Sequence, residues 1–427
     1  MGFILFIVLL VVLFCGVPIA VSMGIAVLSA LTFGDARTPH LLIVQRMFTS
    51  LDNFPFMAVP FFILAGDLMQ CGGISARLID FIKLLLRKLP ARLSVITTVS
   101  SGFFGAISGS NPATVAAIGG IMIPEMKKSG YPPAKAAAIA ATSGTLGVII
   151  PPSISMVTYS LIASVSIGTM FIGGIVPGML LGLVMVAVSM ITCIKFEKKE
   201  AEAVGKGELG RAFVSAISAI MMPVIILGGI YGQFCTPTEA AAVACVYAFI
   251  ISCLVYRELK FKELPAIFAK SARSTAIVLL VVAFSAPFSW LMTSAGIPGK
   301  ITATMLSVFE NKYAILLMMN AALLFLGCFL ETQSIILLMT PILLPLALQF
   351  GIDPVALGLI IVVNTSIGMI TPPMAVNLYV ASSISGATIE QISKQVLPYF
   401  LALAVMVLLF TYVPEILMWL PKLVGGL

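Results

Sequence analysis

The sequence predicts an all-α polytopic membrane protein with an inverted repeat, two re-entrant helical hairpins and two broken helices. The chain is 60% hydrophobic and only 10% charged, its mean hydropathy is +1.15, and one Gly- and Pro-bearing pattern occurs twice. This composition is typical of many apolar helices in a bilayer. The longest polar stretch, residues 195–211, has the length of a loop rather than of a soluble domain.

The doubled pattern recurs after 221 residues. Its five pairs are Gly130 and Gly351, Pro133 and Pro354, Gly147 and Gly368, Pro151 and Pro372, and Pro152 and Pro373. Proline lacks an N–H, and the residue before it avoids the α region, so each Pro-Pro pair interrupts a helix. Unpaired backbone in hydrocarbon is tolerated only where it lines a cavity or binds a ligand. Paired broken helices in corresponding halves indicate a secondary transporter.

Ahead of each broken helix lies a long apolar segment that small or polar residues split at its centre. The first covers residues 93–124 and is split at 108–112; the second covers 314–345 and is split at 331–334. An arm of about 15 residues is roughly 22 Å long, which is shorter than a hydrocarbon core of roughly 30 Å. We therefore predict two hairpins that each enter and leave on one side of the membrane.

Charge in the loops sets the orientation. Residues 195–211 carry five basic residues, and residues 126–135 carry Lys127, Lys128 and Lys135, whereas the equivalent residues 347–356 carry one acid, Asp353. Because basic loops stay in the cytoplasm, the same element faces inward in the first half and outward in the second. The net charge of +7 is explained by these loops, and no nucleic-acid partner is expected.

A consistent trace has ten crossings, with both termini outside. The spans are 3–15, 17–33, 54–71, 134–166, 169–196, 212–231, 238–256, 274–293, 354–384 and 395–419. The first 33 residues could instead form one long tilted helix. The amphipathic runs 75–89 and 256–273 fit helices lying along the interface, or ordinary cytoplasmic loops.

Polar groups should converge where the hairpin tips meet the broken helices. Carbonyl and hydroxyl oxygens without a His or thiol cluster suit Na⁺, and two half-sites imply at least two ions with the substrate between them. Helix N-termini at the tips attract a carboxylate. The candidate substrate ligands are Ser108, Ser110, Asn111, Ser155, Glu331, Thr332 and Gln333. The alternative is that Ser and Thr bond to their own helices and Gly serves helix packing.

Other polar residues have simpler explanations. Thr236, Pro237 and Glu239 form a helix N-terminus with Thr236 as its cap, Pro237 at its first position and Glu239 in its first turn. Asp52 and Asp67 are expected to be structural groups at span ends.

Five segments carry a family resemblance: Thr236–Ala244 (TPTEAAAVA), Val59–Gly66 (VPFFILAG), Gly147–Ser153 (GVIIPPS), Thr340–Pro345 (TPILLP) and Thr371–Leu378 (TPPMAVNL). Through them the chain resembles, over essentially its full length, the large membrane subunit of tripartite ATP-independent periplasmic (TRAP) transporters. The first and fourth segments, together with the doubled Pro-Pro, are the most specific.

The resemblance implies a fold like that of the ion transporter superfamily and an elevator mechanism. A scaffold of residues 1–92, 169–273 (with the cytoplasmic linker) and 385–427 would hold still while residues 93–168 and 274–384 carry the site across the membrane. By position, the resemblance also implies Na⁺ ligands, largely main-chain atoms: Gly105, Ser108, Gly147, Ile150 and Ser153 in one half, and Gly327, Gly368, Thr371 and Met374 in the other.

The resemblance further implies Na⁺ symport of an organic acid across a bacterial inner membrane, with a periplasmic substrate-binding protein. A small four-helix membrane subunit is expected as a separate chain, because this sequence begins at its first span. The substrate is expected to be sialic acid or a C4-dicarboxylate, with a slight preference for sialic acid. A stand-alone Na⁺ or H⁺ carboxylate symporter is the alternative. An intramembrane enzyme is disfavoured, because the chain has one His and lacks a D-x-x-D motif.

Overall fold

The computed structural model describes residues 2–34, 39–196, 208–308 and 311–425, and every regular element in these ranges is helical. By length and composition, seven of its helices can cross a membrane, or eight if one bent pair counts as a single span. The chain is therefore a multi-pass α-helical membrane protein, as the sequence predicts.

The first half contains α1 (Gly2–Phe14), α2 (Ile19–Phe33), α3 (Leu41–Leu51), the 3-10 turn η1 (Phe54–Met57), α4 (Ala58–Cys71), α5 (Ile74–Leu85), α6 (Arg92–Ser108), α7 (Asn111–Lys128), α8 (Pro133–Ser143), α9 (Leu146–Ile149), α10 (Ile154–Ala163) and α11 (Ile167–Cys193). The N-terminal residues form two helices that pack on each other, not one long helix. With 13 and 15 residues, each is too short to span a bilayer in an upright orientation. The two helices match the predicted segments 3–15 and 17–33, and whether each of them crosses the membrane stays a prediction.

The second half contains α12 (Glu208–Tyr231), α13 (Pro237–Phe249), the π-helical turn η2 (Ile250–Val255), α14 (Leu264–Ser294), α15 (Ile297–Val308), α16 (Lys312–Gly327), α17 (Thr332–Gln349), α18 (Pro354–Gly368), α19 (Val376–Ser385), α20 (Ile389–Tyr412) and α21 (Glu415–Gly425). Helices α20 and α21 replace the single predicted span 395–419.

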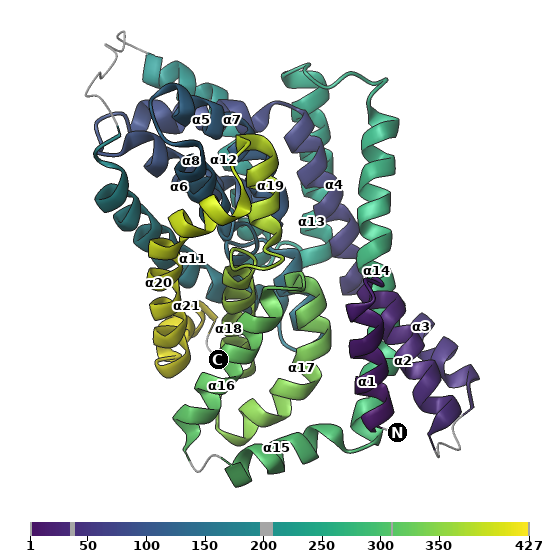
Figure 1. The fold of residues 1–427 in the computed structure, drawn as a ribbon. Helices are drawn as coiled ribbons and strands as arrows, with labels where there is room; N and C mark the ends of the chain where they lie inside the picture. The colour runs from purple at the N-terminus through teal and green to yellow at the C-terminus, as the bar shows by residue number, and fades with distance from the viewer. Residues whose placement is uncertain (1, 35–38, 197–207, 309–310, 426–427) are drawn as a thin grey trace.

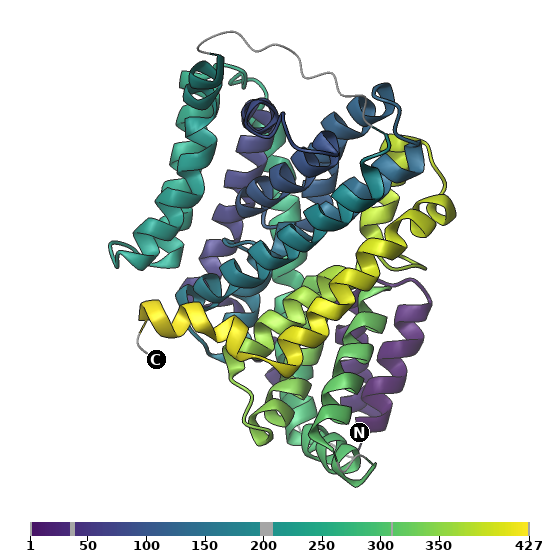
Figure 2. The ribbon, with the colours of Figure 1, turned by 90° about the vertical axis from the view of Figure 1, so that its left-hand side faces the viewer.

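Both predicted hairpins are present, and they approach the centre from opposite sides. Figure 1 shows α6 and α7 in the upper half and α16 and α17 in the lower half, with both tips at mid-height. Gly109 allows the first tip to turn, because its φ of 58° is left-handed. The arms hold 17 and 18 residues in one hairpin and 16 and 18 in the other. They are longer than predicted, and the helices of the first hairpin run obliquely (Figure 2). The inverted repeat is confirmed.

The Pro-Pro pairs lie in the two helix breaks. In the first half, the segment Pro133–Ile149 meets Ile154–Ala163 at an angle of 41°. In the second half, α18 ends at Gly368 and α19 begins at Val376. Both breaks lie against the hairpin tips, so four interrupted elements meet at the centre of the molecule (Figure 1).

Two predictions about the loops are wrong. Helix α5 occupies most of the predicted amphipathic run 75–89, but residues 264–273 begin the 31-residue helix α14 instead of lying along the interface. The counterpart of α5 is α15, because Gly73 and Gly296 each precede the first residue of these helices. Lys135, which was counted in the loop 126–135 but also falls in the predicted span 134–166, is a helix residue. It lies in α8, is 3% exposed, and its ammonium is 5.0 Å from the centre of the Tyr399 ring.

The orientation of the repeat predicts sidedness for residues 128 and 353, which both lie exposed at equivalent corners of the two halves. In a chain whose seven cysteines are replaced, we expect Lys128→Cys and Asp353→Cys to react with a membrane-impermeant maleimide from opposite sides. Intact and inverted vesicles provide the two measurements. Reaction of both cysteines from one side would contradict the inverted orientation.

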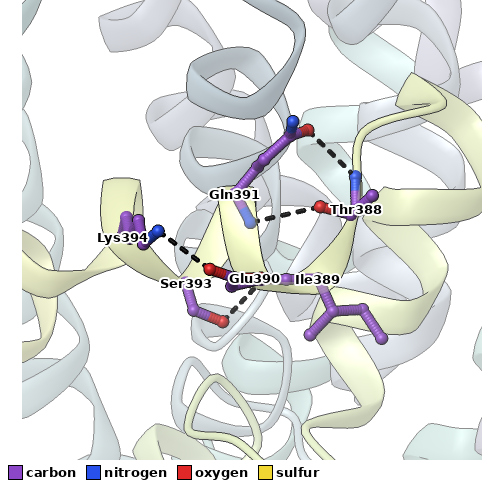
Figure 3. Close-up of polar contacts among 6 residues, drawn as sticks. All are labelled: Thr388, Ile389, Glu390, Gln391, Ser393 and Lys394. Atoms are coloured by element: carbon purple, nitrogen blue, oxygen red, sulfur yellow. Dashed lines mark hydrogen bonds and ion pairs between the residues drawn. The ribbon is translucent and has the colours of Figure 1, made fainter.

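Capping boxes start two helices. The predicted cap is confirmed at α13, where the Thr236 hydroxyl accepts the Glu239 N–H and the Glu239 carboxylate accepts the Thr236 N–H. Figure 3 shows the same arrangement at α20, between Thr388 and Gln391. These caps satisfy N–H groups that a helix N-terminus otherwise leaves without partners.

We expect Thr388→Ala to destabilise the start of α20 by about 1 kcal/mol, because the Gln391 N–H loses its acceptor. Thermal unfolding in detergent measures the change. Ser393→Ala is the matched control, because this hydroxyl donates to a carbonyl within its own helix, that of Ile389. Equal losses of stability in the two variants would contradict the capping role.

Candidate binding site

A cavity of about 300 Å³ lies where the hairpin tips meet α4, α10 and α14. All seven residues predicted as substrate ligands line it. They come from both hairpin tips and from the start of α10, so the structure brings together residues that are more than 200 positions apart. Whether these residues bind substrate stays a prediction.

Three helix N-termini converge on this cavity. Helix α7 begins at Asn111, α10 at Ile154 and α17 at Thr332, and all three residues line the cavity or directly precede residues that line it. A helix N-terminus carries a partial positive charge and N–H groups without helical partners. The cavity therefore favours a negatively charged group.

Asn111 joins the first hairpin tip to both broken helices. Its Oδ1 accepts the Val148 N–H at 3.0 Å, and its Nδ2 donates to the Ser366 hydroxyl at 2.7 Å. Ser366 in turn donates to the Thr145 carbonyl at 2.7 Å. The Asn111 amide is fully buried and hydrogen-bonded within the protein, so this side chain positions the tip. What Asn111 can offer a ligand is the backbone of the α7 N-terminus, where it is the first residue.

The hydroxyl of Ser108 is also engaged within the tip. It lies 2.9 Å from the Thr114 hydroxyl, and Thr114 donates to the Ser110 carbonyl at 2.8 Å. On the opposite tip, the Thr332 hydroxyl donates to the Met369 sulfur at 3.5 Å. These contacts fix the shapes of both tips.

Other cavity groups are available to a ligand. Among the residues that the structure describes, the Ser155 hydroxyl and the Gln333 Oε1 are buried without a hydrogen-bond partner. Glu331, the N-cap of α17, is exposed on the cavity wall. An anion with hydroxyl or amide groups could bond to all three, since carboxylate and amide oxygens accept and a hydroxyl donates or accepts.

The predicted Na⁺ ligands of the first half lie together. A Cβ built on Gly105 would be 2.9 Å from the Gly147 Cα, and one built on Gly147 would be 2.5 Å from the Ser110 carbonyl oxygen. Ile150 is extended and breaks the helix. The Ser153 hydroxyl is buried, and no described residue bonds to it. Backbone oxygens and an unpaired hydroxyl are the donor set that a hard cation requires.

The second half repeats this arrangement in part. A Cβ on Gly368 would be 2.5 Å from the Gly327 Cα, and the Met374 N–H donates to the carbonyl of Cys328, next to Gly327. The Thr371 hydroxyl, however, bonds to the Ile367 carbonyl, and the Met374 side chain is 55% exposed. The Thr371 hydroxyl keeps its oxygen lone pairs when it donates, so it can still face an ion, whereas Met374 offers only main-chain atoms. In the described part of the chain, no three His, Cys, Asp or Glu residues cluster as a transition-metal site.

The wall of the cavity that α4 and α14 supply was not predicted from the sequence. Asp67, Gln70, Lys270 and Ser274 line it, and Lys270 is ion-paired to Asp67 at 2.7 Å. Asp67 was expected to be structural, and residues 256–273 were expected at the interface. One feature of the sequence could have identified Lys270. It lies just before the apolar span 274–293, so a helix that continues into that span would carry this base into the membrane.

Comparisons with known proteins agree with this geometry. Residues 6–416 match the family described as "Tripartite ATP-independent periplasmic transporter, DctM component". The chain is 37% identical to the C4-dicarboxylate TRAP transporter large permease protein DctM of Rhodobacter capsulatus, covering 99% of both chains. It is 33% identical to the sialic acid TRAP transporter large permease protein SiaM of Vibrio cholerae, covering 97% of both.

The chain is also 44% identical to the isethionate TRAP transporter permease protein DctMQ of Oleidesulfovibrio alaskensis, over 95% of this chain. It spans 64% of the length of that relative. Among solved structures, the Alcanivorax borkumensis YdaH transporter shares the fold, with a TM-score of 0.61, 15% identity and 86% of each chain covered. The family match and the full-length relatives settle the family: this chain belongs to the large membrane permease subunits of the tripartite ATP-independent periplasmic transporters.

Proposed function

We propose that this chain is the translocating subunit of a Na⁺-driven, binding-protein-dependent secondary transporter that imports a small organic acid by an elevator mechanism. The observation that carries the proposal is the central cavity, which two hairpin tips and the start of α10 line and on which three helix N-termini converge. This arrangement favours an anion at a depth where polar groups are otherwise costly.

Na⁺ is the coupling ion that best suits the residues at the two breaks. The close contacts between Gly105 and Gly147 and between Gly327 and Gly368 leave backbone oxygens uncovered by side chains, and the Ser153 hydroxyl has no described partner. When bound, Na⁺ would supply positive charge beside the anion, and at least two ions are expected from the two half-sites.

Helix packing suggests which part moves. Helices α11 and α20, placed in the scaffold by the sequence analysis, pack on the hairpins and broken helices and cross the molecule side by side (Figure 2). The predicted boundary between residues 273 and 274 falls inside α14, which packs on α2, α3 and α4. We therefore assign α6–α11 and α16–α21 to the moving unit, and α1–α5 and α12–α15 to the scaffold.

The substrate is proposed to be a small organic anion. The names of the relatives include isethionate, C4-dicarboxylates and sialic acid, which share an ionised acid group and further oxygens. A cavity of about 300 Å³ accommodates a molecule of this size. The proposed partners are a periplasmic substrate-binding protein and a small four-helix membrane subunit, in a bacterial inner membrane.

Uptake into proteoliposomes tests the proposal. The vesicles contain this chain and its small partner, with an inward Na⁺ gradient and no ATP, and the probes are radiolabelled sialic acid, succinate and isethionate. We expect uptake of one probe only when both Na⁺ and the soluble binding protein are present. Replacing Na⁺ by K⁺ is the control for ion coupling.

Two other outcomes have clear meanings. Uptake with Na⁺ alone would make the chain a stand-alone symporter and leave the moving unit intact. Uptake that is indifferent to Na⁺ would overturn ion coupling at the two breaks.

A further inference from the structure

The scaffold wall of the cavity carries one polar cluster. Asp67 and Gln70 come from α4, and Lys270 and Ser274 come from α14, whereas the rest of this wall is glycine or aliphatic. The hairpin tips face this cluster across the cavity. A polar group on the fixed wall meets the substrate only when the moving unit stands beside it.

Lys270 retains capacity to bind a further acceptor. Its ammonium donates to the Asp67 carboxylate at 2.7 Å and to the Gln70 side-chain oxygen at 3.4 Å, while an ammonium has three N–H donors. The Lys270 side chain is 55% exposed, but that of Asp67 is 11% exposed. The other oxygen of Asp67 accepts the Ser271 hydroxyl at 2.6 Å. Asp67 is thus held on both oxygens, and Lys270 is held at the cavity surface.

The charges around the cavity make this ammonium significant. Among the described residues that line it, Lys270 is the one base, and Asp67 and Glu331 are acids. A cationic side chain beside two carboxylates lowers the cost of removing an organic anion from water, because an unpaired charge there is strongly disfavoured. Asp67 and Gln70 hold the Lys270 ammonium at the cavity lining, and its third N–H is available to a further acceptor.

This contact belongs to the cytoplasmic end of the cavity. Helix α5 follows α4 directly, and its Lys83 is ion-paired to Glu125 of α7 at 2.6 Å. The end of α4 therefore lies on the same side as the C-terminal end of α7 (Figure 1), whose last turn carries Lys127 and Lys128. By the distribution of basic residues, this side is cytoplasmic.

The inverted repeat provides a counterpart at the other end. Gly73 and Gly296, which precede α5 and α15, are 223 residues apart. At this spacing Asp67 corresponds to Trp290 and Lys270 corresponds to Met47, which is the residue after Arg46. The Arg46 guanidinium lies 5.3 Å from the centre of the Trp290 ring. Each end of the scaffold thus carries a cationic side chain, and the residues that contact these two cations, Asp67 and Trp290, are equivalent in the repeat.

We propose that the scaffold supplies one cation to the acid group of the substrate in each of the two end positions of the moving unit. Lys270 does so on the cytoplasmic side and Arg46 on the periplasmic side. The inference rests on the proposed transport of an organic anion. In this proposal, scaffold residues that do not move with the binding site contact the substrate. A substitution at one of them should therefore change substrate affinity at one membrane face and leave the affinity at the other face unchanged.

The proposal is tested by measuring, from each face of the membrane, the substrate concentration that gives half-maximal transport (half-saturation). The complete complex is reconstituted, and external binding protein activates only molecules whose periplasmic face is outward. External half-saturation is measured by uptake of succinate, isethionate or sialic acid. Internal half-saturation is measured by exchange against the same unlabelled anion loaded inside. The variants are Lys270→Gln, Lys270→Arg and Arg46→Gln, with Arg273→Gln as control, because Arg273 is exposed on α14 and lies outside the cavity lining.

We expect Lys270→Gln to raise internal half-saturation about tenfold, which is the scale of a hydrogen bond to a charged group, with external half-saturation unchanged. Arg46→Gln should do the reverse, Lys270→Arg should restore internal affinity, and Arg273→Gln should change neither value. Asp67→Asn should lower internal half-saturation, because Lys270 loses its competing carboxylate.

Equal shifts at both faces, or none, in Lys270→Gln and Arg46→Gln would overturn the inference and leave the proposed function standing. Absence of uptake of all three anions by the unmodified complex would overturn both, since the inference requires an anionic substrate.

Discussion

Replacing Gly147 or Gly368 by leucine is expected to abolish Na⁺-driven uptake while the protein remains folded in detergent. Each glycine lies in a helix break against a hairpin arm. A Cβ at Gly147 would be 2.5 Å from the Ser110 carbonyl oxygen and 2.7 Å from the Thr114 hydroxyl, and a Cβ at Gly368 would be 2.5 Å from the Gly327 Cα. Backbone atoms cannot rotate away as a side chain does, so the break and the tip must separate.

Overpacking of this kind costs about 1–3 kcal/mol, which is about a fivefold to 150-fold loss of the close-packed arrangement. Uptake and size-exclusion chromatography in detergent are measured together. Gly120→Leu is the matched control, because Gly120 is an exposed glycine of the same hairpin with no atom within 4 Å of its built Cβ. Normal transport by either Gly147→Leu or Gly368→Leu would end the assignment of the ion sites to the breaks.

Removing the Asn111 amide is expected to produce the next largest loss. In Asn111→Ala the buried Val148 N–H loses its acceptor, at a cost of about 1–3 kcal/mol, and Ser366 loses its donor. Uptake should fall by about fivefold to 150-fold, because the first tip is no longer tied to either broken helix. Asn111→Asp should also fail, since it keeps the acceptor but loses the donor and buries a charge.

Thr158→Ala provides the control for Asn111→Ala. The Thr158 hydroxyl is fully buried but bonds only to the Ile154 carbonyl of its own helix. Its loss should leave uptake within about twofold, in line with substitutions that leave no buried group unpaired. If Asn111→Ala transported as well as Thr158→Ala, the amide would be dispensable for holding the centre together.

The parts of the fold that sequence predicts well are those fixed by covalent structure. Proline cannot continue a helix, so Pro151 and Pro372 locate both breaks whatever packs around them. Polar residues in the middle of apolar segments located both tips for a similar reason, because a helix that crosses at Ser110 or Glu331 would bury polar groups in lipid.

The errors arise where an amphipathic pattern has more than one explanation. Residues 264–273 mix basic and apolar residues, and one of the bases, Lys270, lines the polar cavity; an interfacial helix produces the same pattern. The partnership of Lys270 with Asp67 spans 203 residues and joins two helices, so no local pattern contains it. Lys135 resembled a loop base because its aromatic partner, Tyr399, comes from a distant helix.

The hydrogen bond from Ser366 to Thr145 joins residues separated by 221 positions, so each is the repeat counterpart of the other. A contact between equivalent residues is the mark of an isologous interface, in which a surface meets its own copy about a two-fold axis. The two halves therefore meet as a homodimer would, and a single ancestral half could have assembled this centre from two copies inserted in opposite orientations. Basic loops forbid such dual insertion. Lys127 and Lys128, which the second half lacks at the equivalent corner, give the first half a fixed direction that such a symmetric pair would not have.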